Sequence, residues 1–211
     1  MTAGATETTY TPAEYLARER VAETKSEYRY GRIVAMTGAS LNHNRIALNL
    51  GGELRQQLRG SPCEAFTNDL RVRVSQTGLY TYPDVAVTCG EILYLDEHVD
   101  TLLNPVVLIE VLSPSTEAYD RGEKFEHYKR LDSLREYILV AQDKVHVERY
   151  VHQGDQWVMS ELSALDDVLQ IDAINCSVRL GDIYERVKLS NDATAAASDS
   201  PGSTAGSSTE A

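Results

Sequence analysis

Residues 105–112 limit the fold of this chain more than any other segment, because every side chain in this run except that of Glu110 is apolar. A nearly continuous apolar run of this length is typical of a central β-strand that is covered on both faces. An ionised carboxylate in such surroundings is costly unless a cation or hydrogen-bond donors compensate its charge. We therefore predict an internal strand and interpret Glu110 as a ligand of a divalent metal. The alternative is that Glu110 lies at the exposed end of the strand or pairs with a structural arginine.

The rest of the chain predicts a mixed β-sheet flanked by α-helices. Aromatic and β-branched residues separated by turn residues predict a hairpin over 28–36 and strands over 66–74, 80–88, 136–141, 145–151 and 157–162. Helical spacing and helix-start residues predict helices that begin at Pro12, follow an asparagine cap over 42–58, and run over 117–131 and 181–187. Since no internal repeat or linker interrupts this order, we expect a single α/β domain over residues 10–189.

The chain ends and the cysteines place further limits. Residues 1–9 and 190–211 have few apolar side chains, so we expect both segments to be disordered. Cys63, Cys89 and Cys176 lie far apart without a C-x-x-C pair, which argues against a disulfide framework or a cysteine zinc site and favours a reducing cytoplasm. No apolar run reaches the ~18–20 residues of a membrane helix, and the first residues do not resemble a signal peptide, so we expect no membrane association.

The charge of the chain restricts how it can bind nucleic acid. The formal net charge is −12 at pH 7, whereas a protein that holds a phosphate backbone by its overall field is basic. Any contact with DNA must therefore come from a local basic patch or a bound metal. Basic residues that could supply such contacts are Arg45, Arg55, Arg71, Arg73, Arg121, Lys124, Lys129 and Arg130.

Asp84 is the second candidate acid. It follows Pro83 at the start of a predicted strand, where it shares one face with Ala86. Pro83 removes a backbone donor and indicates an irregular or edge position. An aspartate in this position more often forms a turn than a catalytic site. However, two neighbouring strands can bring Asp84 and Glu110 close enough to share one magnesium ion.

Lys124 is the third candidate. On the predicted helix 117–131 it falls on one stripe with Asp120 and Tyr128, and the apolar members of that stripe indicate that it faces the sheet. An inward lysine could orient or activate a water beside a phosphate. The alternative is an i,i+4 salt bridge between Asp120 and Lys124 on a solvated face.

Two weaker candidates lie upstream. Glu27 precedes the first hairpin strand and taken alone is typical of a surface acid. His43 lies at the start of the helix over 42–58, where a histidine is usually a capping or packing residue. The five histidines form no H-x-x-x-H pair, which disfavours a zinc site. Neither a glycine-rich phosphate loop nor a G-x-S-x-G motif is present in the sequence.

Several segments together point to a known family. They are Ser-Glu-Tyr-Arg-Tyr-Gly-Arg-Ile at 26–33, His43 at a helix start, Tyr-Pro-Asp-Val-Ala-Val at 82–87, Ile-Glu-Val-Leu-Ser-Pro-Ser-Thr at 109–116, and Asp120 with Lys124 and Tyr128. This combination resembles the restriction endonucleases of the Uma type, a branch of the PD-(D/E)XK nuclease superfamily. The resemblance covers about residues 10–187, nearly the whole predicted domain.

The resemblance implies a restriction-endonuclease-like fold and cleavage of DNA phosphodiester bonds with Mg²⁺ or Mn²⁺. Asp84 and Glu110 would then bind the metal, and Glu27 would complete or support the metal site. The superfamily usually has a lysine two residues after the second acid, where this chain has Leu112. The resemblance implies that Lys124 replaces it. His43 matches a histidine that is common in this branch, and the resemblance assigns it no role beyond an accessory one.

Other functions remain open on the sequence alone. A non-cleaving nucleic-acid-binding or protein-interaction module on the same fold would agree with the charge of −12 and with the missing Glu-x-Lys. A metal hydrolase of another phosphoester is a third interpretation. A homodimer would match the two-fold symmetry of duplex DNA, although the residues do not establish one.

Overall fold

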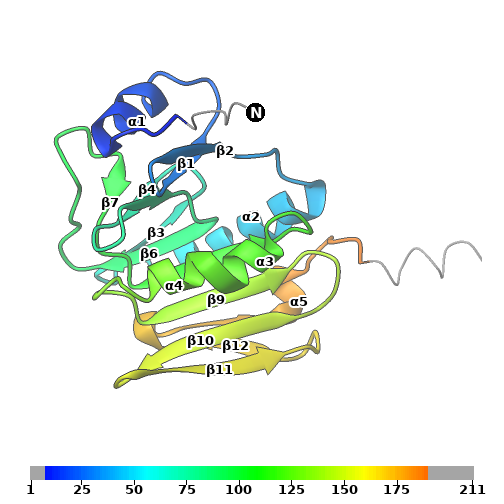
Figure 1. The fold of residues 1–211 in the computed structure, drawn as a ribbon. Coiled ribbons are helices and arrows are strands. Elements are labelled where there is room, and N and C mark those ends of the chain that lie inside the picture. The colour runs from blue at the N-terminus through cyan, green and yellow to red at the C-terminus, as the bar shows by residue number, and fades with distance from the viewer. Residues whose placement is uncertain (1–7, 190–211) are drawn as a thin grey trace, which may run out of the picture.

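The structure, a computed structural model, describes residues 8–189. Segment 190–211 and residues 1–7, for which we predicted disorder, lie outside the described residues. The described strands form a five-stranded sheet in the order β2-β1-β5-β4-β7, a six-stranded sheet in the order β11-β10-β9-β8-β6-β3, and a β12-β13 ribbon (Figure 1). This mixed α/β arrangement confirms the predicted fold class.

Helices and strands alternate irregularly along the chain. In sequence order they are α1 (Pro12–Glu19), β1 (Ser26–Arg29), β2 (Arg32–Ala35), α2 (Leu41–Gln57), β3 (Cys63–Thr67), β4 (Arg71–Val74), β5 (Leu79–Thr81), β6 (Val85–Cys89), β7 (Thr101–Leu102), β8 (Val107–Leu112), α3 (Glu117–Tyr119), the π-helix η1 (Asp120–Lys124), α4 (Phe125–Tyr128), β9 (Glu136–Ala141), β10 (Val147–Gln153), β11 (Gln156–Leu162), β12 (Val168–Ile171), the 3-10 helix η2 (Asp172–Ile174), β13 (Cys176–Arg179) and α5 (Leu180–Ile183).

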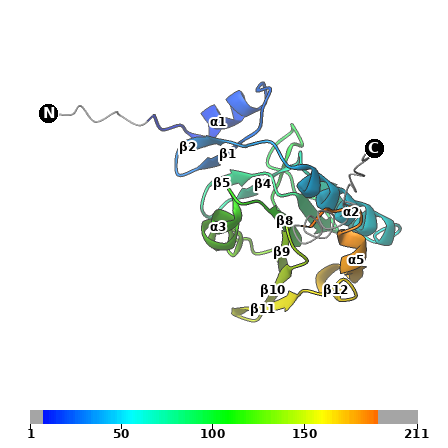
Figure 2. The same cartoon turned by 90° about the vertical axis from the view of Figure 1, so that its right-hand side faces the viewer.

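Strand β8 is internal, as its apolar sequence predicts. It pairs antiparallel with β6 and parallel with β9, and all its residues are buried. Val107, Ile109 and Val111 pack into the core on the side of α2 and α5, whereas Leu108 and Leu112 pack on the side of α4. Figure 2 shows α2 and α5 on one side of β8 and β9, and α3 on the other. Because side chains alternate along a strand, Glu110 faces the α3–η1–α4 segment.

The five-stranded sheet covers the other side of this helical segment. Tyr28 of β1 and Tyr80 of β5 turn away from the segment and pack with Tyr15 of α1. The opposite face of the same strands carries Glu27 and Thr81, which therefore point toward the helical segment. The α3–η1–α4 segment thus lies between the two sheets and receives side chains from both.

Two predicted strands are each interrupted. The segments 66–74 and 80–88 were expected to be continuous, but β3 and β6 belong to the six-stranded sheet while β4 and β5 belong to the five-stranded sheet. Asn68, with φ 54°, and Pro83 lie in the two breaks. The chain therefore crosses from one sheet to the other at both points, and Asp84 lies at the second crossing.

The helices also differ in detail from the prediction. The long helix α2 is capped by Ser40 rather than by an asparagine, and Ser40 Oγ accepts a hydrogen bond from the His43 amide. The helix expected over 117–131 ends at Tyr128, and its middle is the π-helix η1. The helix expected over 181–187 ends at Ile183, and the strands β7, β12 and β13 were not predicted.

A glycine in the middle of α2 marks a close approach of two elements. A Cβ atom at Gly51 would lie 2.8 Å from Cγ2 of Thr67 in β3. A side chain at this position would therefore require Thr67 or the helix to shift. Glycine, despite its low helix propensity, allows α2 to lie this close to β3.

The cysteines correct one expectation. Cys63 and Cys89 are direct partners in the β3–β6 register and form a disulfide bond, so the expectation that they would not pair is wrong. They are 26 residues apart in sequence, and only the register of the two strands brings them together. Cys176 is a buried free cysteine. Within residues 8–189, no helix combines the length and apolar character needed to cross a membrane.

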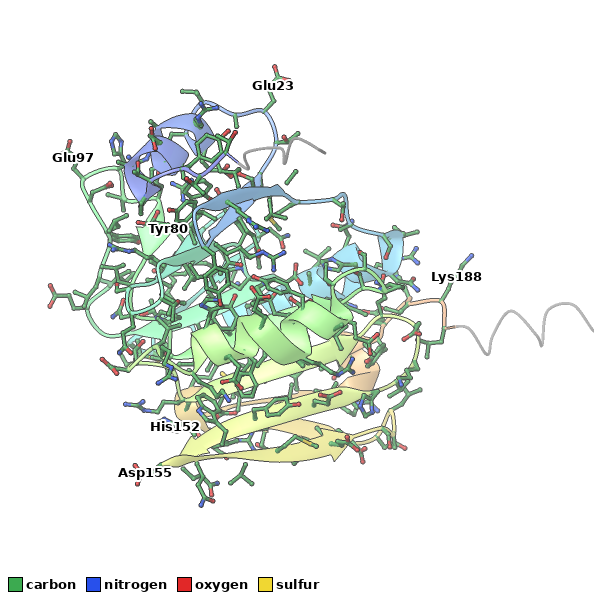
Figure 3. All side chains as sticks on the ribbon, viewed as in Figure 1. Glu23, Tyr80, Glu97, His152, Asp155 and Lys188 are labelled. Atoms are coloured by element: carbon green, nitrogen blue, oxygen red, sulfur yellow. A yellow bond between two sulfur atoms is a disulfide. The ribbon has the colours of Figure 1, made fainter. Side chains whose placement is uncertain are left out.

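The region around the helical segment lies at the middle of the molecule. Figure 3 shows Glu23, in the connection between α1 and β1, and Asp155, in the β10–β11 turn, at opposite ends of the molecule. Both residues are exposed. The α3–η1–α4 segment runs between these ends. The side chains that meet on it come from elements far apart in the sequence, such as β1 and β8.

Candidate active site

Lys124 is surrounded by three acidic side chains. Its Nζ lies 2.8 Å from Oε1 of Glu110, 3.3 Å from Oε1 of Glu27 and 3.4 Å from Oδ1 of Asp120. All four residues are buried, with exposed fractions of 3–7%. The i,i+4 pair with Asp120 that the sequence suggested is present, but on a buried face rather than a solvated one. Lys124 therefore faces the sheet, next to Glu110.

The π-helix positions this lysine. Asp120 and Lys124 are the first and last residues of η1, and Tyr128 follows in α4 on the same buried face. The Tyr128 hydroxyl donates a hydrogen bond of 2.8 Å to Oε1 of Glu110. Single π turns inside α-helices are frequent at functional sites, because the wider turn redirects the side chains it carries. Here the helical segment presents both an ammonium and a hydroxyl to the same carboxylate oxygen.

Glu27 reaches the cluster from the other sheet. Continuing the β1–β5 register places it opposite Thr81, whose hydroxyl donates a hydrogen bond to its Oε1. The same oxygen faces Lys124. Glu27 is therefore a fixed anion that holds the lysine in place from the side opposite Glu110.

Asp84 lies beside Glu110 on the neighbouring strand. Val85 is paired with Ile109, and continuing this antiparallel register places Asp84 opposite Glu110. Asp84 Oδ2 accepts a hydrogen bond of 2.7 Å from the Val111 amide and lies 3.1 Å from Nε2 of His43. His43 therefore touches the site, through the aspartate.

Burial and the neighbouring charges set the protonation of this cluster. Burial raises the pKa of Glu110 to about 8, with the negative charges of Asp120 and Asp84 adding to the rise and Lys124 opposing it. Burial acts against the charged form of Glu27 too, but Lys124 and the Thr81 hydroxyl lower the pKa of that carboxyl below its ordinary value. Burial also acts against the ammonium of Lys124, yet the acids, Glu110 first among them, hold its pKa well above the usual lysine value. Lys124 is therefore a cation near neutral pH.

The donor set can be compared with what a divalent ion requires. Within residues 8–189, no three His, Cys, Asp or Glu side chains converge in a way that could hold a metal ion. The role of Glu27 in completing or supporting a metal site stays a prediction. Magnesium is commonly held by only one or two carboxylates, with water and substrate phosphates as the other ligands. In the described part of the chain, Asp84 Oδ1 and Glu110 Oε2 accept no hydrogen bond. Carboxylate oxygens of this kind are the ligands that such an ion takes.

Some functional neighbours were not identified from the sequence. Thr81 and Tyr119 both lie against Glu27, and burial raises the pKa of the Tyr119 hydroxyl with Glu27 adding to the rise. Neither has a sequence signal, because their contacts depend on the pairing of β1 with β5 and on the position of α3. Among the basic residues expected to contact DNA, Arg71 is buried and paired with Asp100, so it is not available.

Comparison with known proteins agrees with the fold and with the family resemblance. The Uma2 family, described as "Putative restriction endonuclease", matches residues 12–181. The chain belongs to this family. Two uncharacterized proteins of Synechocystis sp. are similar to it. One is 39% identical over 153 residues, which is 72% of this chain and 86% of the relative. The other is 38% identical over 175 residues, which is 82% of this chain and 90% of the relative.

A solved structure also resembles this Uma2 family member. It is a crystal structure described as that of a "putative nuclease" from Anabaena variabilis, with a TM-score of 0.70 and 19% sequence identity. The similarity covers 84% of this chain and 99% of that chain. At this identity the likeness concerns the fold, and it confirms the nuclease-like architecture expected from the sequence.

Proposed function

We propose that this protein is a DNA endonuclease that hydrolyses phosphodiester bonds with Mg²⁺ or Mn²⁺ at Asp84 and Glu110. The observation that carries the proposal is the contact of the Glu110 carboxylate with the Lys124 ammonium at 2.8 Å, with Asp84 opposite Glu110 on the neighbouring strand. Each carboxylate keeps one oxygen without a hydrogen bond in the described residues, while its other oxygen is fixed by the protein. Membership of the Uma2 family, described as "Putative restriction endonuclease", supports the same reaction.

The metal would be held by Asp84 and Glu110 through those oxygens. When bound, it would neutralise charge on the attacked phosphate and make a bound water more acidic. The two acids are also near enough for Asp84 to raise the pKa of Glu110, a repulsion that a shared cation would relieve.

The remaining side chains act on the geometry of the site. Lys124 carries its charge near neutral pH, so it can donate a hydrogen bond to an attacking water or to a phosphate oxygen. Glu27 anchors the ammonium at 3.3 Å and thereby limits where it can point. His43 contacts Asp84 at 3.1 Å, which fixes the carboxylate from the N-terminal turn of α2. We therefore assign Glu27 and His43 positioning roles.

The experiment that tests this proposal is nicking of supercoiled plasmid DNA. The parent protein is incubated with Mg²⁺, with Mn²⁺ or with EDTA, beside Asp84→Asn and Glu110→Gln. Glu64→Gln is the matched control, because Glu64 is an exposed acid on the neighbouring strand β3. We expect metal-dependent nicking by the parent and by the control, and none by the two site variants.

Two results would contradict the proposal. Nicking that survives both site substitutions would place the activity elsewhere or in a contaminant. A folded parent that binds DNA but does not nick it with either metal would favour the non-cleaving module, with which the net charge of −12 also agrees. If the activity is present, light scattering in solution tests whether it belongs to a homodimer, which would place two sites on the two DNA strands.

A further inference from the structure

A pocket of about 420 Å³ lies beside the candidate active site and is not used by the chemistry proposed above. It is lined by Arg29, Tyr30, Arg32, Val34 and Glu123. Its walls are the β1–β2 hairpin and the π-helix η1, which lie on the same side of the molecule in Figure 2. Arg29 joins these walls by an ion pair of 3.4 Å with Glu123. A salt bridge at such an exposed position contributes little stability and can be exchanged for another anion.

The tyrosine of this pocket occupies an unusual position. Tyr30 and Gly31 form the tip of the hairpin, with φ of 50° and 81°. Two successive residues with positive φ favour asparagine or glycine, and a bulky side chain at the first of them is strained. Tyr30 is nevertheless 68% exposed, and its ring contact with the buried His127 covers only a small part of it. A strained, exposed aromatic residue beside a pocket indicates that its ring has a partner.

A buried histidine that contacts the Tyr30 ring is also incompletely paired. His127 is buried, its ring lies 5.3 Å from that of Tyr30, and its Nδ1 lies 2.7 Å from the Thr77 hydroxyl. Its Nε2 is buried and has no hydrogen-bond partner in the part of the chain that the structure describes. A buried polar atom without a partner is costly. His127 supports one side of the Tyr30 ring but does not itself line the pocket.

The pocket is connected to the active site through one ring. The guanidinium of Arg29 lies 4.3 Å from the centroid of the Tyr119 ring, and Nζ of Lys124 lies 5.9 Å from the same centroid. Glu27, the anchor of Lys124, is on the same strand and the same face as Arg29. The pocket therefore lies next to the residues that hold Lys124 in place.

We propose that the pocket holds an unpaired nucleotide of the substrate DNA strand, with its base stacked on Tyr30 and its phosphate at Arg29 and Arg32. The inference rests on the proposed function, because it takes DNA as the substrate. Stacking on an exposed aromatic ring and contact of arginine with phosphate are the features by which proteins hold single-stranded DNA. A site of this kind gives an acidic protein a local contact with DNA, although the overall negative charge of the protein repels the DNA backbone.

The first test distinguishes the contribution of the Tyr30 ring to DNA binding from its contribution to stability. Binding of a fluorescein-labelled single strand of about 15 nucleotides is measured by anisotropy in EDTA, where no cleavage occurs. Tyr30→Asn suits the positive φ of the turn but has no aromatic ring, so we expect the melting temperature to stay or rise while affinity falls at least about fivefold. Tyr30→Phe keeps the ring, and we expect its affinity to stay within about twofold of the parent. Parent-like binding by Tyr30→Asn would overturn the proposal.

The second test concerns the ion pair across the pocket. If Arg29 holds a phosphate, Arg29→Ala weakens binding, whereas Glu123→Gln strengthens it by removing a competing negative charge. If the pair serves only to hold η1 against the hairpin, both variants lose affinity together. Photo-crosslinking of a strand that carries 5-iododeoxyuridine supplies an independent readout, with Tyr30 as the expected crosslinked residue. Crosslinks confined to other peptides would contradict the proposal.

These results are distinguishable from those for the proposed function. Binding that depends on Tyr30, with no nicking by the parent, would support the pocket and contradict the endonuclease. Nicking with parent-like binding by Tyr30→Asn would do the reverse. A parent that binds no DNA in any form would contradict both proposals.

Discussion

Two buried glutamates on adjacent parallel strands are held in the core by different sets of contacts. Glu110 of β8 and Glu136 of β9 are 4% and 1% exposed. Each lies beside a cation, Lys124 at 2.8 Å for Glu110 and Arg149 at 2.7 Å for Glu136. The two acids are therefore alike in residue type, in burial and in having a cation beside them.

Their oxygens are not alike. Glu136 accepts a hydrogen bond on each oxygen, from Nε of Arg149 and from the Ala173 amide. Glu110 receives Lys124 and the Tyr128 hydroxyl on the same oxygen, Oε1. Its second oxygen accepts none within residues 8–189. The first arrangement is complete and serves the fold, whereas the second leaves a ligand position open beside Asp84.

Substituting each glutamate by glutamine gives the largest expected difference. Glu110→Gln removes a proposed metal ligand, and we expect plasmid nicking to fall by at least about 100-fold, since even indirect supports of a metal change activity by about 10–100-fold. Glu136→Gln should keep nicking near that of the parent at temperatures where the variant is folded, but lower its melting temperature. A loss of nicking in Glu136→Gln while it remains folded would break the distinction between the two acids.

Removing the two cations is the next comparison. Lys124→Met leaves Glu27 and Asp120 in the core without their counter-charge, and we expect the free energy of unfolding to fall by about 3–5 kcal/mol. Added Mg²⁺ should restore part of this loss, because an ion at Asp84 and Glu110 would supply positive charge to the cluster. Arg149→Met should be destabilised too, with no recovery in Mg²⁺. Denaturant unfolding with and without the metal measures both effects, and equal responses of the two variants to Mg²⁺ would contradict the assignment.

Much of the fold could be predicted from the sequence, because its strongest signals come from residues that are close together in the chain. The apolar run of β8, the capping box of α1 and the hairpins of β1–β2 and β10–β11 depend on residues close in sequence. The break at Asn68 was missed, and Pro83 indicated an irregular or edge position but not a change of sheet, since a crossing between two sheets leaves little trace in periodicity. The Cys63–Cys89 disulfide was missed for a related reason, because it depends on the register of β3 and β6.

The residues of the candidate site also divide into those with a local signal in the sequence and those without one. Glu110 stands out because it interrupts an apolar run, and the inward orientation of Lys124 follows from the stripe that it shares with Tyr128. The π turn, however, depends on packing between two sheets and has no signal in the sequence. The contact of Glu27 with Thr81 depends on the pairing of β1 with β5. The acids and Lys124 could therefore be named in advance, whereas Thr81 and Tyr119 could not.

The pH dependence of stability should reflect the unusual state of Glu110. Burial raises its pKa from the ordinary value of 4.5 to about 8 in the folded protein. Between these values the folded state holds a proton that the unfolded state has released, so the free energy of unfolding falls as pH rises. One such proton gives a slope of at most about 1.4 kcal/mol per pH unit.

Urea unfolding at several pH values between about 5 and 8 measures this slope. Glu110→Gln should lack the contribution and show a flatter profile than the parent. The pKa of Glu27 is lowered from 4.5 in the folded protein, so its contribution to the free energy of unfolding rises with pH. This contribution changes only below its ordinary pKa of 4.5, outside the measured window. An unchanged slope in Glu110→Gln would show that the carboxyl is not the group that titrates.

The smallest expected effect concerns the two tyrosines that stand beside these acids. Tyr128→Phe removes the hydroxyl that donates to Glu110, and we expect a loss of about 1–2 kcal/mol in the free energy of unfolding. Tyr137→Phe is the matched control, because its buried hydroxyl donates to the Asp120 carbonyl instead. The stability losses should be similar. Only Tyr128→Phe should move the pH profile of nicking upward, since without the donor the ionised form of Glu110 is less favourable. Equal shifts in both variants would mean that Tyr128 acts through packing with Tyr137, and not on the acid it contacts.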